Sequence, residues 1–416
     1  LQMKNLLTIL CVLLFTNTIF AQQTIRAFFA GNSYTAANNL PQLISNAALS
    51  AGDTLQFSSN LMGGATLQGH AGNANTLEPI QVGNWDYVIL QAQSQEPSFP
   101  IAQVQANTFP YAEALNDSIE KYQPCGETMF YMTWGRENGD ANNCAFFPPL
   151  CTYEGMDSML RLRYQMMAND NDAELSPVGA VWRYIRTNHP NIDLYSSDGS
   201  HPSAAGSYAA ACTFYTSMFR EDPTAITFDF SLTAADALTI RNATKVVVFD
   251  DLLTWNIGAY DPMASFTFTT TDNADFSFAN TSTNADGYSW DFGDGNTSSL
   301  ANPTNFYSNF GDYTVTLSVF NCGDTSTISD TITAYVVHTA PIIDEDIFHL
   351  SPNPTSGIIN IRTNITDFDI TIYNEIGQLV LKTKSMKIDI SNQPKGIYFI
   401  NIEFDGKKVQ KQVLKL

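Results

Sequence analysis

The stretch IRAFFAGNSYT at residues 25–35 begins with an apolar run and ends in a Gly-Asn-Ser-Tyr-Thr turn sequence. The run Ile25–Ala30 is typical of a short buried strand, and Ala36–Ser50 has the periodicity of a helix. Ser33 is therefore expected on a strand-to-helix turn at the carboxyl edge of a sheet, where α/β enzymes place their reacting groups. Its backbone N–H would also lie near a helix N-terminus, which stabilises negative charge. The same position suits a helix-capping serine, so this stretch alone leaves both interpretations open.

The alternation of strands and helices continues from Gln22 to Pro262. Further strand-like runs are Asp86–Leu90 and Thr128–Met132, and further helical runs are Val104–Tyr122, Met156–Met167 and Ser203–Phe219. Strands that alternate with helices predict an α/β domain whose parallel sheet is covered on both faces.

The charge balance excludes one class of partner. The chain has 416 residues, 44% of them hydrophobic, with 20 Lys and Arg against 41 Asp and Glu, a net charge of −21. It is long enough for two or three domains and apolar enough to bury a core. A chain this acidic repels phosphate backbones, so we expect no nucleic-acid partner. Residues 347–416 alone carry a net charge of +3, which indicates a C-terminal module with a separate role.

A second candidate pair lies just before the last helical run of the α/β region. Asp198 and His201 are three residues apart in Asp-Gly-Ser-His. Side chains at this spacing can project from one tight turn, so that the carboxylate orients an imidazole toward a nucleophile elsewhere. Alone, the pair also suits an ordinary turn with a helix cap. Combined with Ser33 upstream, it indicates a Ser-His-Asp arrangement.

Over roughly residues 24–220 these motifs resemble, in order and spacing, the SGNH (GDSL-like) hydrolase family. The resemblance implies a three-layer α/β/α fold with a flavodoxin-like parallel sheet and hydrolysis of carboxylic esters without a metal or organic cofactor. The family's first block appears as Gly31-Asn32-Ser33, which gives Ser33 the place of the nucleophile. Its fifth block matches at Asp198 and His201, the acid and the base of the triad.

The family's second block supplies an oxyanion-hole glycine, best matched by Gly64 with Gly63 as a rival. The third block, normally Gly-x-Asn-Asp, differs here, because the strand Tyr87–Leu90 runs into Gln-Ala-Gln-Ser-Gln. Gln93 stands where the family has its donor Asn, and a Gln amide can donate the same hydrogen bond. Gln91 and Gln95 remain alternatives. The expected oxyanion donors are thus the backbone N–H groups of Ser33 and Gly64 and the Gln93 side chain.

Several other polar residues are candidates for substrate contact, namely Asn32, Gln91, Gln95 and Arg136. Arg136 follows the strand Thr128–Met132 at the functional edge; it can hold an acidic or sugar substrate, or pair with Glu137 or Asp140. His70 follows the glycine segment and either lines the cleft or lies on the surface. His189 is expected at a helix end.

Two smaller modules follow the α/β region. The motif Tyr-Ser-Trp-Asp-Phe-Gly-Asp-Gly at residues 288–295, within an all-β segment, resembles the PKD domain, and its acidic residues either bind calcium or are solvated turn residues. Residues 350–413 resemble the C-terminal sorting domain of type IX secretion, which implies a Bacteroidetes-type envelope and the type IX machinery as partner. The expected organisation is a signal peptide at 1–21, an SGNH-like domain at 22–262, PKD at 263–337, a linker at 338–346 and the sorting domain at 347–416. Both C-terminal modules are expected to be small Ig-like sandwiches.

The N-terminal segment predicts secretion. Lys4 precedes an apolar run at Leu6–Leu14 that is too short to span a membrane, and a small-residue exit follows at Phe20-Ala21. No other segment is long and apolar enough to cross a membrane. Cys11 would leave with this signal. In an oxidising compartment Cys144 and Cys151 can form a short-loop disulfide that Cys125 can also join, whereas Cys212 is expected as a core thiol.

We therefore expect a secreted or cell-surface serine esterase that deacetylates an O-acetylated polysaccharide through an acyl-enzyme. A lipid or arylester hydrolase is the alternative among enzymes. A different class also remains open, because the altered first and third blocks suit an inactive surface adhesion or glycan-binding protein.

Overall fold

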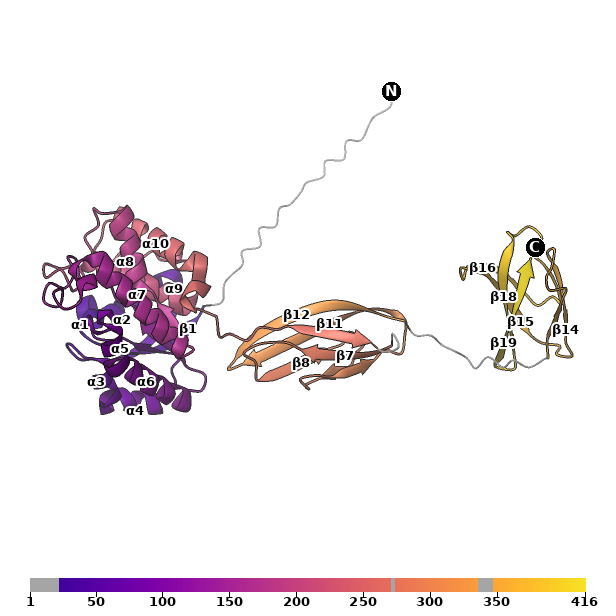
Figure 1. The fold of residues 1–416 in the computed structure, drawn as a ribbon, viewed down its shortest axis with the longest axis horizontal. Coiled ribbons are helices and arrows are strands. Elements are labelled where there is room, and N and C mark those ends of the chain that lie inside the picture. Colours follow the sequence, from indigo (N-terminus) through magenta and orange to yellow (C-terminus); the bar gives the residue numbers. More distant parts are fainter. Residues whose placement is uncertain (1–21, 271–273, 336–346) are drawn as a thin grey trace, which may run out of the picture.

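The computed structural model describes residues 22–270, 274–335 and 347–416. Figure 1 shows a body of helices and strands followed along the chain by two bodies made of strands. The expected signal peptide at 1–21, with Cys11, and the expected linker at 338–346 lie outside the described residues. Among the helices that are described, none combines the length and the apolar character that crossing a bilayer requires.

The first body is built on a parallel sheet. Its strands are β1 (Thr24–Gly31), β2 (Thr54–Leu61), β3 (Tyr87–Leu90), β4 (Glu127–Tyr131) and β5 (Glu174–Ser176), in the spatial order β2-β1-β3-β4-β5. Every neighbouring pair is parallel. This is the flavodoxin-like order, in which ligands bind at the carboxyl edge where the strand order reverses, here between β1 and β3. The predicted fold class is confirmed.

Helices cover both faces of this sheet. The helices longer than ten residues are α2 (Leu40–Ala51), α6 (Phe109–Tyr122), α7 (Tyr153–Asp170), α8 (Val178–Asn188), α9 (Ala204–Phe219) and α10 (Ala234–Val247). α9 contacts α2, α8 and α10, whereas α6 contacts α7 and the short helices α3 (Leu67–Ala71), α4 (Ala74–Val82) and α5 (Ile101–Asn107). Strands β1, β3 and β4 are buried between these two groups because their side chains are apolar on both faces.

Two predicted helices have different limits in the structure. Within the run Ala36–Ser50, the long α-helix begins only at Leu40, because Asn38 and Asn39 adopt left-handed backbone angles with φ of 51° and 52°. The run Val104–Tyr122 is divided between α5 and α6, and a proline lies in the first turn of α6. Proline lacks the N–H that a continuous helix would need at that point.

The second body is a two-sheet module. The sheet β10-β7-β6 contains β6 (Phe266–Thr270), β7 (Asp275–Asn280) and β10 (Thr304–Phe306). The sheet β12-β11-β8-β9 contains β8 (Gly287–Asp291), β9 (Thr297–Ser298), β11 (Gly311–Asn321) and β12 (Asp324–Ala334). Trp290 is fully buried against Phe278 and Phe292 in the shared core.

The third body is a smaller pair of antiparallel sheets. One contains β13 (His349–Ser351), β14 (Ile358–Arg362) and β17 (Lys387–Asp389); the other contains β15 (Asp369–Asn374), β16 (Leu379–Thr383), β18 (Gly396–Phe404) and β19 (Lys407–Lys415). Gly377 and Gly406 lie in turns and adopt left-handed angles with φ of 77° and 68°.

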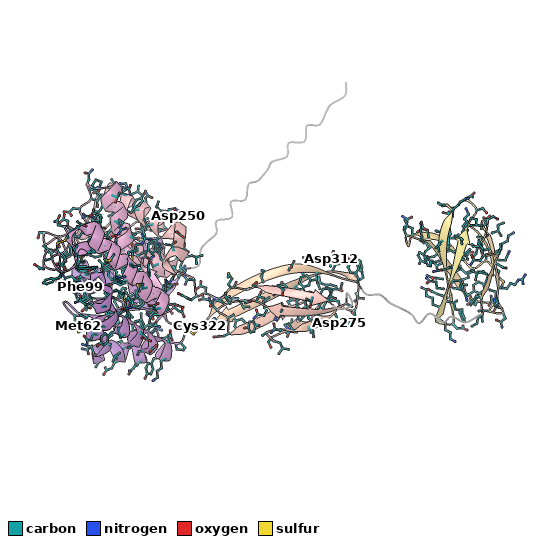
Figure 2. All side chains as sticks on the ribbon, viewed as in Figure 1. Met62, Phe99, Asp250, Asp275, Asp312 and Cys322 are labelled. Carbon is teal, nitrogen blue, oxygen red and sulfur yellow. A yellow bond between two sulfur atoms is a disulfide. The ribbon has the colours of Figure 1, made fainter. Side chains whose placement is uncertain are left out.

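The described part of the chain contains two disulfides, and one corrects an expectation. Cys144 is bonded to Cys151, as the sequence suggests. Cys125 does not join that pair but is bonded to Cys322 in the turn between β11 and β12, 197 positions later. Figure 2 labels Cys322 at the end of the second body that meets the α/β domain. Cys212 is a buried free thiol, as predicted.

Candidate active site

Ser33, His201 and Asp198 form a continuous hydrogen-bonded chain. Ser33 is the first residue of α1 (Ser33–Ala36), directly after β1, and its Oγ lies 2.9 Å from His201 Nε2. His201 Nδ1 lies 2.5 Å from Asp198 Oδ2. Because the carboxylate accepts the Nδ1 proton, the Nε2 lone pair faces the Ser33 hydroxyl, the tautomer that a general base needs.

The second oxygen of Asp198 holds the turn together. Oδ1 accepts from the backbone N–H groups of Ser200 at 3.0 Å and His201 at 2.9 Å, and from Ser196 Oγ at 3.1 Å. Partial desolvation raises the pKa of Asp198, but the hydrogen bonds from His201, Ser200 and Ser196 outweigh it and hold the pKa well below its usual range. Gly199, with φ of 64°, provides the left-handed angle of this turn.

Two backbone N–H groups near Ser33 are available to an oxyanion. Ser33 N–H is at the first position of a helix, where no acceptor exists within the helix. Gly64 has φ of 69° in a turn closed by the Ala65 N–H and the carbonyl of Met62, a residue labelled in Figure 2. Gly64 is exposed, and only Gly64 of the two rival glycines has this left-handed angle. Within the described part of the chain, neither N–H has a protein acceptor.

The three glutamines of the third block have different environments. Gln91 is fully buried; its Oε1 accepts from Asn32 N–H at 3.0 Å and Thr35 Oγ1 at 2.6 Å, and its Nε2 donates to Asn32 Oδ1 at 2.7 Å. Gln95 donates its amide to Asp140 Oδ2 at 2.6 Å. Both amides are therefore occupied by protein groups.

Gln93 keeps donor capacity. Its Oε1 accepts from the N–H groups of Gln95 at 2.7 Å and Glu96 at 3.2 Å, which fixes the orientation of the amide. Its Nε2 has one long contact, 3.3 Å to Ser94 Oγ. Gln93 is half-buried, and of the three glutamines it alone has a side-chain N–H whose one protein contact is a long hydrogen bond.

The side chains of the remaining candidates for substrate contact, Asn32 and Arg136, interact with other protein groups. Asn32 is 2% exposed, and its Nδ2 donates to the carbonyls of Ala65 and Ala92 at 3.2 Å each, so it joins the nucleophile turn to the second and third blocks. Arg136 is half-buried and pairs with Asp140 at 3.2 Å, one of the two alternatives that its sequence context offers.

His70 does not lie on the surface or line a cleft. It is fully buried, with Nε2 3.1 Å from the Gly31 carbonyl and Nδ1 2.9 Å from Thr76 Oγ1. Burial lowers its pKa, so the imidazole is neutral and donates from Nε2 to Gly31. His189 ends α8, as predicted.

The site also contains residues that sequence reasoning missed. Tyr34 and Ser200 are the neighbours of Ser33 and His201, and their hydroxyl oxygens lie 2.7 Å apart. Trp134 Nε1–H donates to the Ser200 carbonyl at 3.1 Å. Their positions beside the two motifs were the available signal, but their mutual contact depends on the fold.

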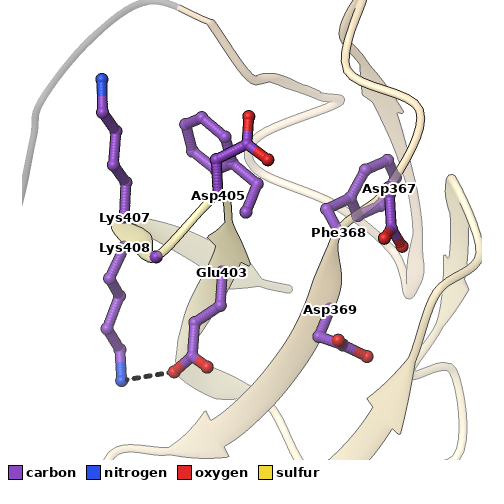
Figure 3. Close-up of a pocket in the computed structure, with 9 residues that line it drawn as sticks. Asp367, Phe368, Asp369, Glu403, Asp405, Lys407 and Lys408 are labelled. Carbon is purple, nitrogen blue, oxygen red and sulfur yellow. Dashed lines mark ion pairs between the residues drawn. The ribbon is translucent and has the colours of Figure 1, made fainter.

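A surface hollow of about 510 Å³ lies elsewhere, in the third body, where Lys408 pairs with Glu403 at 3.0 Å (Figure 3). Its lining contains no Ser, Cys or His, so it offers no hydroxyl or thiol nucleophile beside an imidazole base. Across the described ranges, no group of three or more His, Cys, Asp or Glu side chains is arranged to hold a metal ion.

Comparison with known proteins identifies the two C-terminal modules. A PKD domain matches residues 260–336, and a secretion system C-terminal sorting domain matches residues 349–415. A search of curated proteins finds no match.

Solved structures are similar to single parts of the chain. A candidate SGNH hydrolase from Slackia heliotrinireducens is 25% identical over 46% of this chain and 97% of its own, with a TM-score of 0.39. A DUF4886 family protein from Bacteroides uniformis is 18% identical over 55% of this chain and 95% of its own, with a TM-score of 0.47. The first PKD domain of a Vibrio cholerae metalloprotease is 37% identical over 18% of this chain and 99% of its own, with a TM-score of 0.18. The chain thus carries an α/β domain with a flavodoxin-like parallel sheet, a PKD domain and a type IX sorting domain, and the last marks it as a secreted or cell-surface protein.

Proposed function

We propose that this protein is a serine esterase that hydrolyses carboxylic esters through an acyl-enzyme. The observation that carries the proposal is the hydrogen-bonded chain from Asp198 through His201 to Ser33, with distances of 2.5 and 2.9 Å. A carboxylate that orients an imidazole base, which in turn contacts a serine hydroxyl, is the arrangement by which unrelated hydrolases activate a serine. We assign the catalytic domain to residues 22–262, PKD to 263–337 and the sorting domain to 347–416.

The geometry supports a two-step reaction. Ser33 Oγ attacks the ester carbonyl while His201 Nε2 takes its proton. The tetrahedral intermediate collapses as His201 returns that proton to the leaving alkoxide, which departs as an alcohol. A water molecule, deprotonated by His201, then attacks the acyl-enzyme, and as this second intermediate collapses His201 returns the proton to Ser33 Oγ and the carboxylic acid leaves. Asp198 stays ionised throughout, because its pKa is held low, and it stabilises the imidazolium that forms twice in the cycle.

The developing oxyanion is assigned to three donors. These are the Gln93 amide and the backbone N–H groups of Ser33 and Gly64. Among the described residues, neither backbone N–H donates a hydrogen bond to a protein acceptor. Preorganised donors of this kind stabilise the transition state more than the ground state, by roughly 2.7–4 kcal/mol for one donor.

We propose an O-acetylated polysaccharide as the substrate. Support comes from the architecture, since the α/β domain is exported together with a PKD module. The bond to be broken is the ester between an acetyl group and a sugar hydroxyl.

The test uses purified protein and two assays. Wild type should hydrolyse p-nitrophenyl acetate and release acetate from at least one of a panel of acetylated glycans. Ser33→Ala and His201→Ala should each lose about a thousandfold in turnover while remaining folded. Turnover within tenfold of wild type for either variant would refute the triad; hydrolysis of the small ester without acetate release from any glycan would refute the substrate.

A further inference from the structure

The Ser33–His201 contact joins residues 168 positions apart, so further contacts are needed to hold the two segments at the correct distance. Tyr34 follows the nucleophile directly, and Ser200 precedes the base directly. The Tyr34 hydroxyl oxygen lies 2.7 Å from Ser200 Oγ. This hydrogen bond therefore runs alongside the one between Ser33 and His201 and connects the same two segments.

Trp134, which follows β4 in the chain, contacts the loop that carries Ser200. Its Nε1–H donates to the Ser200 carbonyl at 3.1 Å, and its ring stacks on Tyr34 with centroids 4.8 Å apart and an interplanar angle of 2°. On its other side Trp134 stacks on Trp182 at 3.7 Å. Trp134 and Trp182 are fully buried, so the stack gives Tyr34 a rigid support.

The Tyr34 ring also contacts the base itself. Its centroid lies 5.3 Å from that of His201, in an edge-on arrangement at 74°. Tyr34 is 2% exposed, and this burial raises the pKa of its hydroxyl, which therefore stays protonated at the pH at which an esterase works. The ring limits rotation of the imidazole, while the hydroxyl holds the loop that carries it.

We propose that Tyr34, Ser200 and Trp134 form a clamp that sets the approach of His201 to Ser33. The three are positioning residues, because they act on the triad and not on the substrate. The inference rests on the proposed function, since the distance that the clamp controls is the one across which the proton moves. Reaction rates are sensitive to such geometry, and a displacement of about 1 Å can cost about a hundredfold.

The kinetic test compares four variants in the full chain. Tyr34→Phe removes the hydroxyl and keeps the stacked ring, and Ser200→Ala removes its partner. Each should lower kcat for p-nitrophenyl acetate by about ten- to hundredfold with KM within twofold, and should slow inactivation of Ser33 by a fluorophosphonate by the same factor. The double variant should be no slower than the worse single variant, because both substitutions remove the same Tyr34–Ser200 hydrogen bond.

Tyr131→Phe is the matched control. Tyr131 is also fully buried and packs near Trp134, with centroids 6.3 Å apart, but its hydroxyl has no hydrogen-bond partner among the described residues. This variant should keep wild-type turnover. A Tyr34→Phe enzyme that also keeps it, or singles whose losses multiply in the double variant, would overturn the clamp.

A second measurement does not depend on activity. The proton between His201 Nδ1 and Asp198 Oδ2 should give a far-downfield NMR resonance in wild type. In Tyr34→Phe, but not in Tyr131→Phe, this resonance should broaden or disappear because the loop is no longer held. If wild type hydrolyses no ester yet shows this difference, the proposed function fails and the clamp stands. If the resonance is unchanged in an active Tyr34→Phe enzyme, the clamp fails and the function stands.

Discussion

Cys125 is covalently bonded to Cys322, so the connection that leads into β4 of the α/β domain is tied to the β11–β12 turn of the PKD domain. Cys125 lies just before β4 and therefore at the amino end of the sheet, whereas Ser33 follows the carboxyl end of β1. The cross-link thus holds the PKD domain at the edge opposite the candidate active site.

Removing this cross-link should loosen the junction without stopping catalysis. We expect the double variant Cys125→Ser, Cys322→Ser to be cleaved by a protease near residues 256–265 at least about tenfold faster than wild type, because a disulfide that closes a long loop stabilises by about 4 kcal/mol. Turnover of p-nitrophenyl acetate should stay within twofold.

The control for that experiment is the double variant Cys144→Ser, Cys151→Ser. It loses the other disulfide, which closes a short loop within one domain. Its junction should remain protected. Equal protection of the junction in both double variants would show that Cys125–Cys322 does not secure the PKD domain.

The glutamines of the third block should respond differently to truncation. Gln93→Ala should lower kcat by about a hundredfold and leave KM nearly unchanged, since an oxyanion donor acts in the transition state. Gln93→Asn should recover only part of this, because its amide is one methylene shorter.

Gln91→Ala should instead destabilise the fold. It leaves the buried Asn32 N–H and the Thr35 hydroxyl without their acceptor, which costs about 1–3 kcal/mol for each unsatisfied group. Thermal unfolding and steady-state kinetics on both variants separate the two effects. A large kcat defect in Gln91→Ala at unchanged stability, with Gln93→Ala active, would move the donor role to Gln91.

The acid limb of the pH profile should follow a single proton. Hydrogen bonds hold the pKa of Asp198 well below its usual range, so this carboxylate stays ionised and adds no second proton to the acid limb. The slope of log(kcat/KM) against pH should therefore be about 1 on the acid side. A slope near 2 would mean that Asp198 also titrates there.

The lowered pKa of Asp198 also makes the free energy of unfolding depend on pH. Because folding lowers the pKa of Asp198, its stabilising contribution is present above the unfolded value of about 3.9 and is lost as the pH falls below it. The Asp198 side chain is 49% exposed, so the contribution is small. Asp198→Asn should therefore change unfolding little while lowering turnover by about a thousandfold.

Export should depend on the sorting domain. Deleting the chain from Leu350 onward removes β14–β19 and should leave an active enzyme trapped inside the cell envelope, because the α/β domain has a core of its own. Full-length Ser33→Ala should reach the medium at the wild-type level and serves as the control. Normal secretion of the truncated chain would contradict the role of this domain.

Features that depend on a single turn or element of this protein were predictable from its amino-acid sequence. Ser33 at a strand end, the Asp198 and His201 spacing, the Trp290 motif and the Cys144–Cys151 loop could all be read because their residues act within one turn or one element. Strand β5, three residues long, was missed because so short a run has no detectable period.

The long-range partner of each polar side chain, by contrast, depends on how the whole chain folds. Cys125 bonds to Cys322 and not to its nearer neighbours, His70 is buried beneath Gly31, and Gln91 is bound to Asn32 while the Gln93 amide keeps donor capacity. The three glutamines have the same chemistry within five positions, so composition and spacing cannot separate them. Their difference arises because parallel β1 and β3 lie side by side and place Gln91 against the nucleophile turn, a register set by the packing of the whole sheet.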